Sequence, residues 1–237
     1  MEQAVLPVLV AFHTGRCIRA AVDSFHRHFP GDMVLVVDNN PGRGEPGWTP
    51  DCDAERSWLR AQPDVLLLKN DGPGKGHGAG VDRAVAWCRE GGVELMLHFE
   101  PDCLVTGRRW YDALRAAVDR GAWMAGSHRK RYGPIHPTPS LWRVDRIATS
   151  FEVQPRGADA RHPLFHQLVD VDWLTDTVRE EGGPWAWWRD HWDTGQRAWF
   201  QAAVLGRAEA VPETDDFHHF WYGSTARRDR PAFTGGV

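Results

Sequence analysis

Short apolar runs of β-strand length alternate with amphipathic helical stretches through the first half of the chain. Between the runs, apolar side chains recur at the three-to-four-residue spacing of one helix face. Strands that alternate with helices in this way form a mostly parallel sheet with crossover helices. The sequence therefore predicts an α/β fold, in which helices flank a mixed, mostly parallel central sheet. The four expected strands are Val5–Phe12, Met33–Val37, Val65–Lys69 and Glu94–Phe99.

The composition favours one globular domain. Of the 237 residues, 42% are hydrophobic and 25% are charged, which is ordinary globular usage and excludes disordered and fibrous classes. No linker-like segment divides the chain. The formal net charge of −4 argues against a nucleic-acid binder, because such proteins need a concentrated positive field.

The apolar and cysteine patterns favour a cytoplasmic protein. The longest uninterrupted apolar runs are about five residues, whereas a membrane-spanning helix needs roughly 20. The N-terminal residues lack the basic start and apolar stretch of a secretory signal. The four cysteines (Cys17, Cys52, Cys88 and Cys103) are widely spaced and form no C-x-x-C pair, so we expect reduced thiols rather than disulfides or a zinc site.

Polar residues follow three of the four expected strands. Asp38-Asn39-Asn40 comes after the second, a glycine-dense segment over 70–80 after the third, and Glu100-Pro101-Asp102 after the fourth. The carboxyl ends of parallel strands meet at one edge of a sheet, where ligands bind. Acidic groups gathered there need a positive partner, and Mg²⁺ or Mn²⁺ commonly bridges such carboxylates to a diphosphate. The alternative for Glu100-Pro101-Asp102 is a solvated turn.

The glycine-dense segment is not a Walker A loop, because Gly76 rather than Ser or Thr follows Lys75. It matches the loosest G-x-G-x-x-[GA] dinucleotide pattern, but it follows the third strand, whereas that pattern normally opens the first strand-to-helix turn. Small residues here would let backbone amides approach an anion at a helix N-terminus, with Lys75 or His77 nearby. Alternatively, the glycines only permit a tight crossover.

Tryptophan is concentrated near the end of the chain. The chain has 13 Trp, and the last quarter contains Trp185, Trp187, Trp188, Trp192, Trp199 and Trp221. These rings could form ordinary core. Sugars also present flat C–H faces that stack on aromatic rings, so Trp185, Trp188 or Trp192 could form the floor of an acceptor pocket.

The order and spacing of the three strand-end motifs resemble those of the GT-A glycosyltransferases, particularly the family-2-like transferases. Asp38-Asn39-Asn40, Asn70-x-Gly72 and Glu100-Pro101-Asp102 are similar to the D-N-x, N-x-G and D-x-D signatures of that family. The likeness covers roughly residues 5–127 and is looser beyond. It implies a single GT-A (Rossmann-like) domain over residues 1–237, with a nucleotide-sugar-binding half over about 1–127 and an acceptor-binding half over about 128–237.

The resemblance also implies roles for individual residues. Asp38 would hold the nucleoside, with Phe12 and His13 near its base, and Asp102 would be the principal metal ligand. Glu100 departs from the usual first Asp of the D-x-D signature, so it would bind the metal directly or through water. The donor-binding residues would be Phe12, His13, Asp38, Asn40, Asn70, Lys75, His77, Gly78 and Glu100.

Two candidates lie nearer the C-terminus. Asp193, in Trp192-Asp193-Thr194-Gly195, would be the general base, or it could cap a helix expected over Gln196–Arg207. His218 and His219 stand where many such enzymes carry a late metal-ligand histidine. Because they alternate across a strand, at most one would face the metal, and both could be structural or surface residues instead.

The function implied by the resemblance is glycosyl transfer. A metal-dependent enzyme, using Mg²⁺ or Mn²⁺, would move a sugar from a nucleotide-diphosphate sugar to a hydroxyl or amine of a small-molecule or glycan-precursor acceptor, by an inverting displacement with Asp193 as base. The Q-x-x-R-W signature of processive synthases is absent, which favours single transfers. The alternatives are a Rossmann-type nucleotide-dependent oxidoreductase and a non-catalytic carbohydrate-binding protein.

Overall fold

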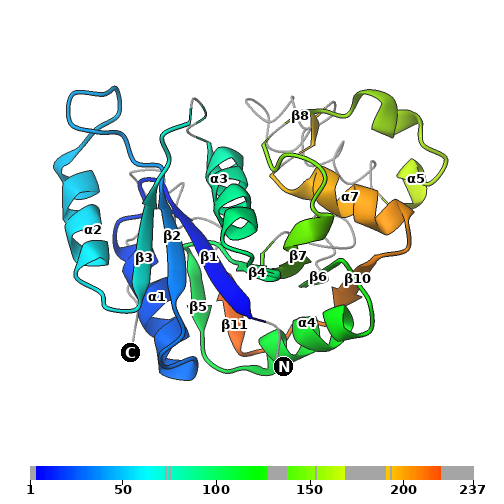
Figure 1. Cartoon of the computed structure of the whole chain (residues 1–237), viewed down its shortest axis with the longest axis horizontal. Helices are drawn as coiled ribbons and strands as arrows, with labels where there is room; N and C mark the ends of the chain where they lie inside the picture. Colours follow the sequence, from blue (N-terminus) through cyan, green and yellow to red (C-terminus); the bar gives the residue numbers. More distant parts are fainter. Residues whose placement is uncertain are drawn as a thin grey trace, which may run out of the picture.

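The protein is built on a seven-stranded sheet with the strand order β10-β6-β7-β4-β1-β2-β3 (Figure 1). The computed structural model describes residues 4–72, 74, 76–127, 138–152, 154–168, 191–192 and 194–219. All neighbouring strands pair in parallel except β7, which runs antiparallel to both β4 and β6. The mixed, mostly parallel sheet predicted from the sequence is therefore confirmed. Its strands are β1 (Val5–Ala11), β2 (Val34–Asp38), β3 (Val65–Lys69), β4 (Leu95–His98), β6 (Met124–Ser127), β7 (Ser140–Arg143) and β10 (Ala208–Val211).

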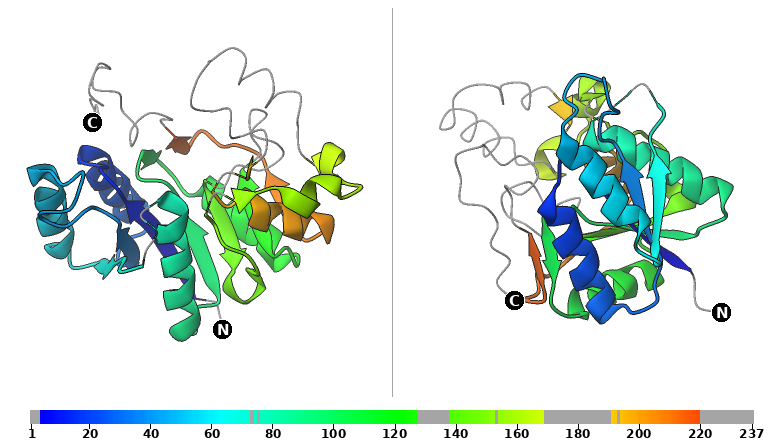
Figure 2. Two further views of the ribbon diagram at one scale, coloured as in Figure 1. Left: turned by 90° about the horizontal axis from the view of Figure 1, so that it is seen from above. Right: turned by 90° about the vertical axis from the view of Figure 1, so that its left-hand side faces the viewer.

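Helices cover both faces of the sheet (Figures 1 and 2). On one face lie α1 (Arg16–His28), α2 (Pro50–Arg60) and α4 (Arg109–Asp119), and on the other lie α3 (His77–Glu90) and α7 (Gln196–Val204). The shorter elements are the helices η1 (Val144–Arg146), η2 (Gly157–Arg161) and α5 (Phe165–Leu168), the antiparallel pair β5 (Cys103–Val105) and β11 (Phe217–His219), and the pair β8 (Gln154–Pro155) and β9 (His191–Trp192).

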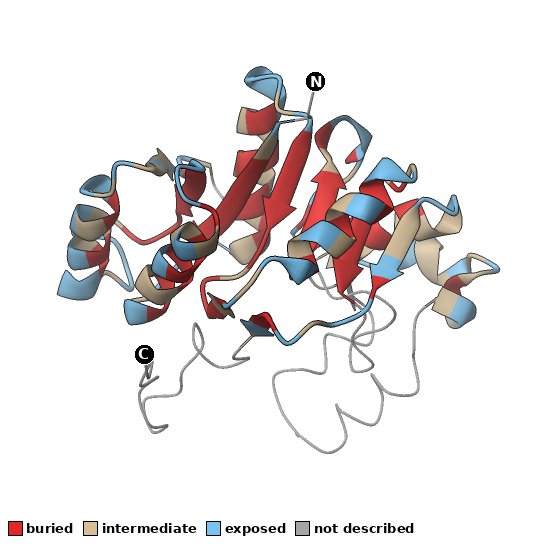
Figure 3. Ribbon diagram, turned by 90° about the horizontal axis from the view of Figure 1, so that it is seen from below, coloured by how far each residue is buried: buried red, intermediate tan, exposed pale blue. Residues whose placement is uncertain are grey.

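The core consists of two apolar layers separated by the sheet. Along β1, Val8 and Val10 pack on the α3 side, whereas Leu9 and Ala11 pack on the α1 side, because successive side chains of a strand point to opposite faces. Every residue of β2 is buried, which explains its uninterrupted apolar sequence. In Figure 3 the central strands are accordingly coloured as buried along most of their length, and the helices mainly on their inner sides.

Helix boundaries differ from the sequence-based expectation at two places. α3 begins at His77, one turn before the first apolar residue that marks it, Val81, because glycines occupy the first turn and show no apolar pattern. α7 ends at Val204 rather than Arg207; Gly206 follows with φ +62°, a left-handed conformation that ends the helix. The sequence reading also assigned no element to the stretch that forms α2.

The chain after Ala122 contains further strands of the central sheet, although the alternation of strand and helix patterns in the sequence is clear only in the first half of the chain. β6 and β7 extend the sheet beyond β4, and β10 joins its edge. The antiparallel register places Ser140 of β7 beside His98 of β4, so this second half of the chain reaches the same sheet edge as the strand-end motifs. Among the described helices, none is long and apolar enough to cross a membrane.

Gly80 lets α3 lie close to the sheet. A Cβ atom at this position would stand 2.5 Å from Val10 Cγ1 and 2.8 Å from Asn39 Nδ2, closer than van der Waals contact allows. By contrast, a Cβ atom on Gly76 would have no atom within 4 Å. The glycines of this segment are therefore not equivalent, and at Gly80 the requirement is close packing.

We predict that Gly80→Ala lowers the free energy of unfolding by about 1 to 3 kcal/mol, the usual range for overpacking. Urea denaturation followed by circular dichroism measures this change. Gly76→Ala is the matched control and is expected to change stability by less than about 0.5 kcal/mol, as at ordinary surface positions. Equal effects of the two substitutions would contradict the packing role of Gly80.

Candidate nucleotide and metal site

The strand-end motifs gather at one edge of the sheet, as the sequence predicted. Asp38 ends β2, Asn70 follows β3 directly, and Glu100 and Asp102 follow β4. β2 and β3 are neighbours, whereas β1 lies between β2 and β4. Because these four strands are parallel, all the motifs stand at their carboxyl ends, the edge where α/β sheets bind ligands.

Two carboxylates and a histidine form a compact cluster at the tip of β4. His219 Nε2 lies 2.6 Å from Glu100 Oε2 and 3.2 Å from Asp102 Oδ1. The side chains of His219 and Asp102 are only 3% and 4% exposed. The pairing of β11 with β5 puts His219 opposite Cys103, next to Asp102. The cluster therefore joins residues separated by about half of the chain.

His218 does not reach these carboxylates. It is exposed, and its Nε2 lies 3.5 Å from Thr106 Oγ1. Successive side chains on a strand point to opposite sides, so the expectation that at most one of the two histidines faces the acidic groups agrees with the geometry. Of the two residues predicted, the structure places His219 there.

Asp216 holds β11 in position. Its carboxylate accepts a 2.6 Å hydrogen bond from the backbone N–H of Arg109, at the start of α4, and its carbonyl accepts one of 2.9 Å from the N–H of Thr106. A Cβ atom on Gly107 would stand 2.7 Å from the Asp216 Cβ. The backbone at Gly107 therefore lies in close contact with the segment that leads into β11. Sequence reading missed Asp216, whose role depends on contacts between distant segments.

The cluster suits a divalent cation. Its donors are carboxylate oxygens and an imidazole nitrogen, which Mn²⁺ accepts and of which Mg²⁺ favours the oxygens. Cys103 also places a ligand atom within 4.8 Å of those of Asp102 and His219. Burial raises the pKa of the Cys103 thiol well above its usual value, and a thiolate is a soft ligand, whereas Mg²⁺ and Mn²⁺ favour oxygen ligands. The residues that would hold the ion are Glu100, Asp102 and His219.

A second pair of histidines lies at the same edge. His77, at the start of α3, places its Nε2 3.2 Å from Nε2 of His98, the fully buried last residue of β4. Burial is the main influence on His77 and lowers its pKa. A neutral imidazole can donate a hydrogen bond to the other ring or accept one from it. His98 was missed from the sequence, although it precedes Phe99-Glu100 at the end of a predicted strand.

Glu55 of α2 ties together the loops that follow β1 and β2. One of its carboxylate oxygens accepts hydrogen bonds from Thr14 Oγ1, at 2.9 Å, and from the N–H of Gly15, at 2.6 Å. The other accepts a 2.6 Å bond from Asn40 Nδ2. Glu55 is 2% exposed, and burial raises its pKa against the effect of these bonds. Asn40 in turn accepts the N–H of His13 at 2.7 Å.

Arg56 makes the corresponding contacts with Asp38. Its Nε donates to Asp38 Oδ2 at 2.6 Å, and its guanidinium also bonds the carbonyls of Asn40 and Pro41. The other oxygen of Asp38 accepts the N–H of Asn40 at 3.0 Å. Asp38 is 4% exposed and is held by Arg56, a partner that the sequence reading missed. The start signal Thr49-Pro50-Asp51 could have revealed the helix that carries both Glu55 and Arg56.

Phe12 and His13 directly follow β1, which ends at Ala11. Phe12 is 38% exposed, and its ring centroid lies 4.7 Å from that of His13. His13 has φ +54°, an uncommon conformation for a residue other than glycine. Two accessible rings at this edge suit the predicted contact with a nucleobase, which stays a prediction.

The glycine segment is fixed by two asparagines. Asn70 Nδ2 donates to the carbonyl of Gly74 at 2.9 Å and to Asn39 Oδ1 at 2.7 Å, and Asn39 Nδ2 donates to the carbonyl of Gly76 at 2.7 Å. At Gly78 a Cβ atom would stand 2.7 Å from the backbone nitrogen of Glu152. Gly78, like Gly80, therefore permits close packing, and its predicted part in anion binding stays untested.

Some predicted residues lie outside the described part of the chain. These are Lys75, Asp193, Trp185 and Trp188, and only the backbone of Trp192 is described. The N-cap residue of α7 is Gly195, two residues after Asp193. The predicted role of Asp193 as general base is therefore untested.

Three solved structures have a fold similar to that of this chain, at low sequence identity. A mannosyltransferase from Pyrobaculum calidifontis in complex with GDP-Man and Mn²⁺ matches with a TM-score of 0.54 at 16% identity, covering 88% of this chain and 55% of that one. A 4-diphosphocytidyl-2C-methyl-D-erythritol synthase from Anaerococcus prevotii matches with a TM-score of 0.50 at 8% identity, covering 92% and 90%. A protein from Bacillus anthracis, assigned as a glucose-1-phosphate thymidylyltransferase, matches with a TM-score of 0.50 at 10% identity, covering 96% and 97%.

At these identities the comparisons show the fold alone, which is the GT-A-like α/β fold shared by glycosyltransferases and nucleotidyltransferases. The chain spans about half of the mannosyltransferase chain and nearly all of the other two. No protein-family model and no curated protein matches the sequence, so the family-2-like assignment is not confirmed.

We predict that Glu55→Ala lowers the free energy of unfolding by about 2 to 4 kcal/mol, because three donors lose a buried acceptor at once. Urea denaturation measures the loss, and hydrogen exchange is expected to accelerate at the Gly15 amide. Glu90→Ala, at an exposed position at the end of α3, is the control. If the two variants are equally stable, Glu55 does not hold these loops.

His219 gives a pH dependence in protein freed of metal by a chelator. Burial, the largest influence, lowers the His219 pKa, but the hydrogen bonds and charges of Asp102 and Glu100 outweigh it and raise the pKa to about 9, from 6.5. The protonated form is thus favoured by folding. Its contribution to stability, at most about 3 kcal/mol, is fully present below pH 6.5 and is lost as the pH rises through 9.

Urea denaturation of the wild type and of His219→Gln at several pH values between 6 and 10 checks this prediction. We expect a stability difference that is largest at pH 6 and shrinks toward pH 10. His218→Gln, on the opposite side of the same strand, is expected to behave as the wild type. A difference between wild type and His219→Gln that is independent of pH would refute the assignment.

Proposed function

We propose that the protein is a metal-dependent glycosyltransferase that uses a nucleotide-diphosphate sugar. The observation that carries the proposal is the cluster of Glu100, Asp102 and His219 at the carboxyl edge of a parallel sheet, in which the side chains of Asp102 and His219 are buried. This edge also carries the tethered loops of Asp38 and Asn40, where a nucleoside would bind. The fold, shared with a mannosyltransferase in complex with GDP-Man and Mn²⁺, supports the same assignment.

In the proposed reaction, an acceptor hydroxyl or amine attacks the anomeric carbon of the donor sugar. The bond from that carbon to the β-phosphate oxygen breaks, the nucleoside diphosphate leaves with the bond's electron pair, and the acceptor's proton passes to a base. A bound Mg²⁺ or Mn²⁺ would neutralise the charge that develops on the diphosphate. Glu100, Asp102 and His219 would hold it, with Asp102 as the principal ligand.

The remaining roles follow from position. Asp38 and Asn40 order the loops around the nucleoside, and Phe12 and His13 offer rings to its base. His77, Asn70 and the backbone near Gly78 would border the diphosphate, and Lys75, which lies outside the described residues, is proposed from its sequence position to contact it as well. Asp193, which precedes α7, is the proposed base. In this assignment, residues up to about 127 bind the donor, and residues from about 128 bind a small-molecule or glycan-precursor acceptor.

Nucleotidyl transfer is the second candidate. The synthase and thymidylyltransferase structures match over 90% or more of both chains, whereas the mannosyltransferase is about twice as long as the matched part. The two activities differ in their products: glycosyl transfer or donor hydrolysis releases a nucleoside diphosphate, while nucleotidyl transfer from a nucleoside triphosphate releases pyrophosphate.

Isothermal titration with uridine, guanosine and thymidine diphosphates, with Mn²⁺ and then with chelator, tests the proposal. We expect one of them to bind, with affinity at least tenfold higher in the presence of Mn²⁺. Asp102→Asn is expected to abolish the Mn²⁺ effect and donor hydrolysis, whereas Asp119→Asn, at the exposed end of α4, retains both. Binding of none of the three, together with affinity for NAD, would instead support an oxidoreductase.

Product analysis separates the remaining alternatives. Incubation with nucleotide sugars is expected to release nucleoside diphosphate, and incubation with nucleoside triphosphates and sugar 1-phosphates to release no pyrophosphate. Saccharide binding that neither chelator nor Asp102→Asn changes would support a non-catalytic carbohydrate-binding protein. Asp193→Asn is expected to keep nucleotide affinity and to lose transfer by about 100-fold or more; normal transfer by this variant would remove Asp193 as the base.

A further inference from the structure

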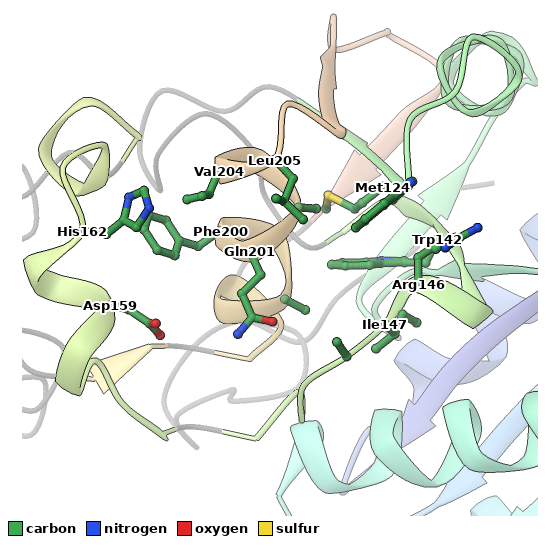
Figure 4. Close-up of a pocket in the computed structure, with 14 residues that line it drawn as sticks. Met124, Trp142, Arg146, Ile147, Asp159, His162, Phe200, Gln201, Val204 and Leu205 are labelled. Atoms are coloured by element: carbon green, nitrogen blue, oxygen red, sulfur yellow. The ribbon is translucent and has the colours of Figure 1, made fainter.

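A separate cavity of about 350 Å³ lies between α7 and the strands at the other end of the sheet (Figure 4). Met124 of β6 and Trp142 of β7 contribute to it from the sheet, and Ala198 and Ala202 from α7. The two alanines are one helical turn apart, so they lie on the same face of α7. Because their side chains are small, the helix leaves space over the indole of Trp142 instead of filling it.

The inner part of this cavity is apolar. Met124, Trp142, Ala198 and Ala202 are all at most 6% exposed. Ile147, Phe200, Val204 and Leu205 extend the apolar lining; Figure 4 shows Phe200 and Val204 on α7 and Leu205 at its C-terminal end. A volume near 350 Å³ lies at the lower end of the range of small-molecule sites, whose linings are also predominantly apolar and aromatic.

The two side chains of fixed charge that line the cavity, Arg146 and Asp159, already have partners of opposite charge, and the Nδ1 of a third lining group, His162, accepts the N–H of Leu164 at 3.2 Å. Arg146 pairs with Asp145 at 3.0 Å, and its guanidinium also lies over the Trp123 ring, 5.4 Å from the centroid. Asp159 pairs with Arg197 at 2.7 Å. A charged ligand would compete with these contacts. The half-buried amide of Gln201 is an uncharged group at the same cavity that can donate and accept hydrogen bonds.

The cavity is distinct from the strand-edge site. Trp142 pairs with Met96 and Met124 in the middle of the sheet, two residues from Ser140, which stands beside His98 at the edge. Phe151 packs between the two regions: its ring centroid lies 5.0 Å from that of Trp142, and its carbonyl accepts the N–H of Gly195 at 3.2 Å. None of the residues assigned above to donor or metal binding lines the cavity.

We propose that this cavity binds a small, uncharged molecule with a flat apolar ring system and a single hydroxyl or N–H group. The ring would lie in the space between Trp142 and the two alanines of α7, and the polar group would meet Gln201. This proposal goes beyond glycosyl transfer and rests only on the shape and lining of the cavity. It holds whether or not the strand-edge site proves catalytic.

The test uses 2-naphthol and indole as probes on the full chain, without donor or metal. We expect each to bind with a stoichiometry of one and a dissociation constant on the order of 0.1 mM, as for compact ligands of this size. Selective ¹³C labelling of the methionine methyl groups locates the site. The Met124 methyl resonance is expected to shift on addition of either probe, because it would face the ring, whereas that of Met33, exposed before β2, is not.

Ala202→Leu supplies the blocking variant. The larger side chain would occupy the cavity without removing any existing contact, so we expect an unchanged or higher melting temperature and at least tenfold weaker binding of both probes. Ala210→Leu makes the same change at an exposed position of β10 that does not line the cavity, and it is expected to bind as the wild type does.

Four results would overturn the proposal. The first is that neither probe binds, as expected if other side chains of this chain fill the cavity. The second is unchanged binding to Ala202→Leu, and the third is unfolding of that variant, which would show that there is no space to fill. The fourth is equal or tighter binding of 2-naphthalenesulfonate or of methyl α-glucoside, which would indicate a charged-ligand or a sugar site.

Discussion

The ion pairs of His219 with Glu100 and Asp102 are the interaction on which the candidate site depends. Two carboxylates held next to each other repel, and that of Asp102, whose side chain is 4% exposed, also loses most of its hydration. A cation must therefore stand between them, and in the protein alone that cation is the protonated imidazole of a residue near the end of the chain. β11, which carries His219, is therefore part of the site. The hydrogen bond of Asp216 to Arg109 and the close approach of Gly107 to Asp216 hold this strand in place.

The parallel sheet supplies the geometry around this cluster. Polar residues at the carboxyl ends of its strands lie along one edge, and the helices between the strands contribute side chains of different kinds to this edge. α2 uses adjacent residues, Glu55 and Arg56, to bond the loops after β1 and β2. α3 contributes His77. Its glycines Gly78 and Gly80 let the N-terminal turn of the helix pack closely against the Phe151–Glu152 segment and the sheet. Loops built on such contacts are held in place by the protein itself, which would lower the entropic cost of binding a ligand at this edge.

Local patterns predicted the fold and the position of the strand-end residues at one edge of the sheet, because apolar periodicity and strand order follow from short segments. Asp38, Asn70, Glu100 and Asp102 were found because each follows a predictable strand. Contacts between distant segments were less accessible. Arg56 as the partner of Asp38, His98 beside His77, and the choice of His219 over His218 all depend on register and crossover geometry. The antiparallel β7 and the apolar cavity at α7 were missed for the same reason, since neither leaves a periodic signal in the sequence.

The segment around Phe151 and Glu152 packs against both the first turn of α3 and Trp142 of β7. On one side its backbone presses against Gly78, where a side chain has no room, and on the other its ring lies on Trp142. The identity of residue 78 and the course of this segment are therefore linked. Natural relatives that carry a larger residue at the position of Gly78 are expected to carry an insertion, a deletion or a redirected turn near Phe151, so the two positions should vary together during evolution.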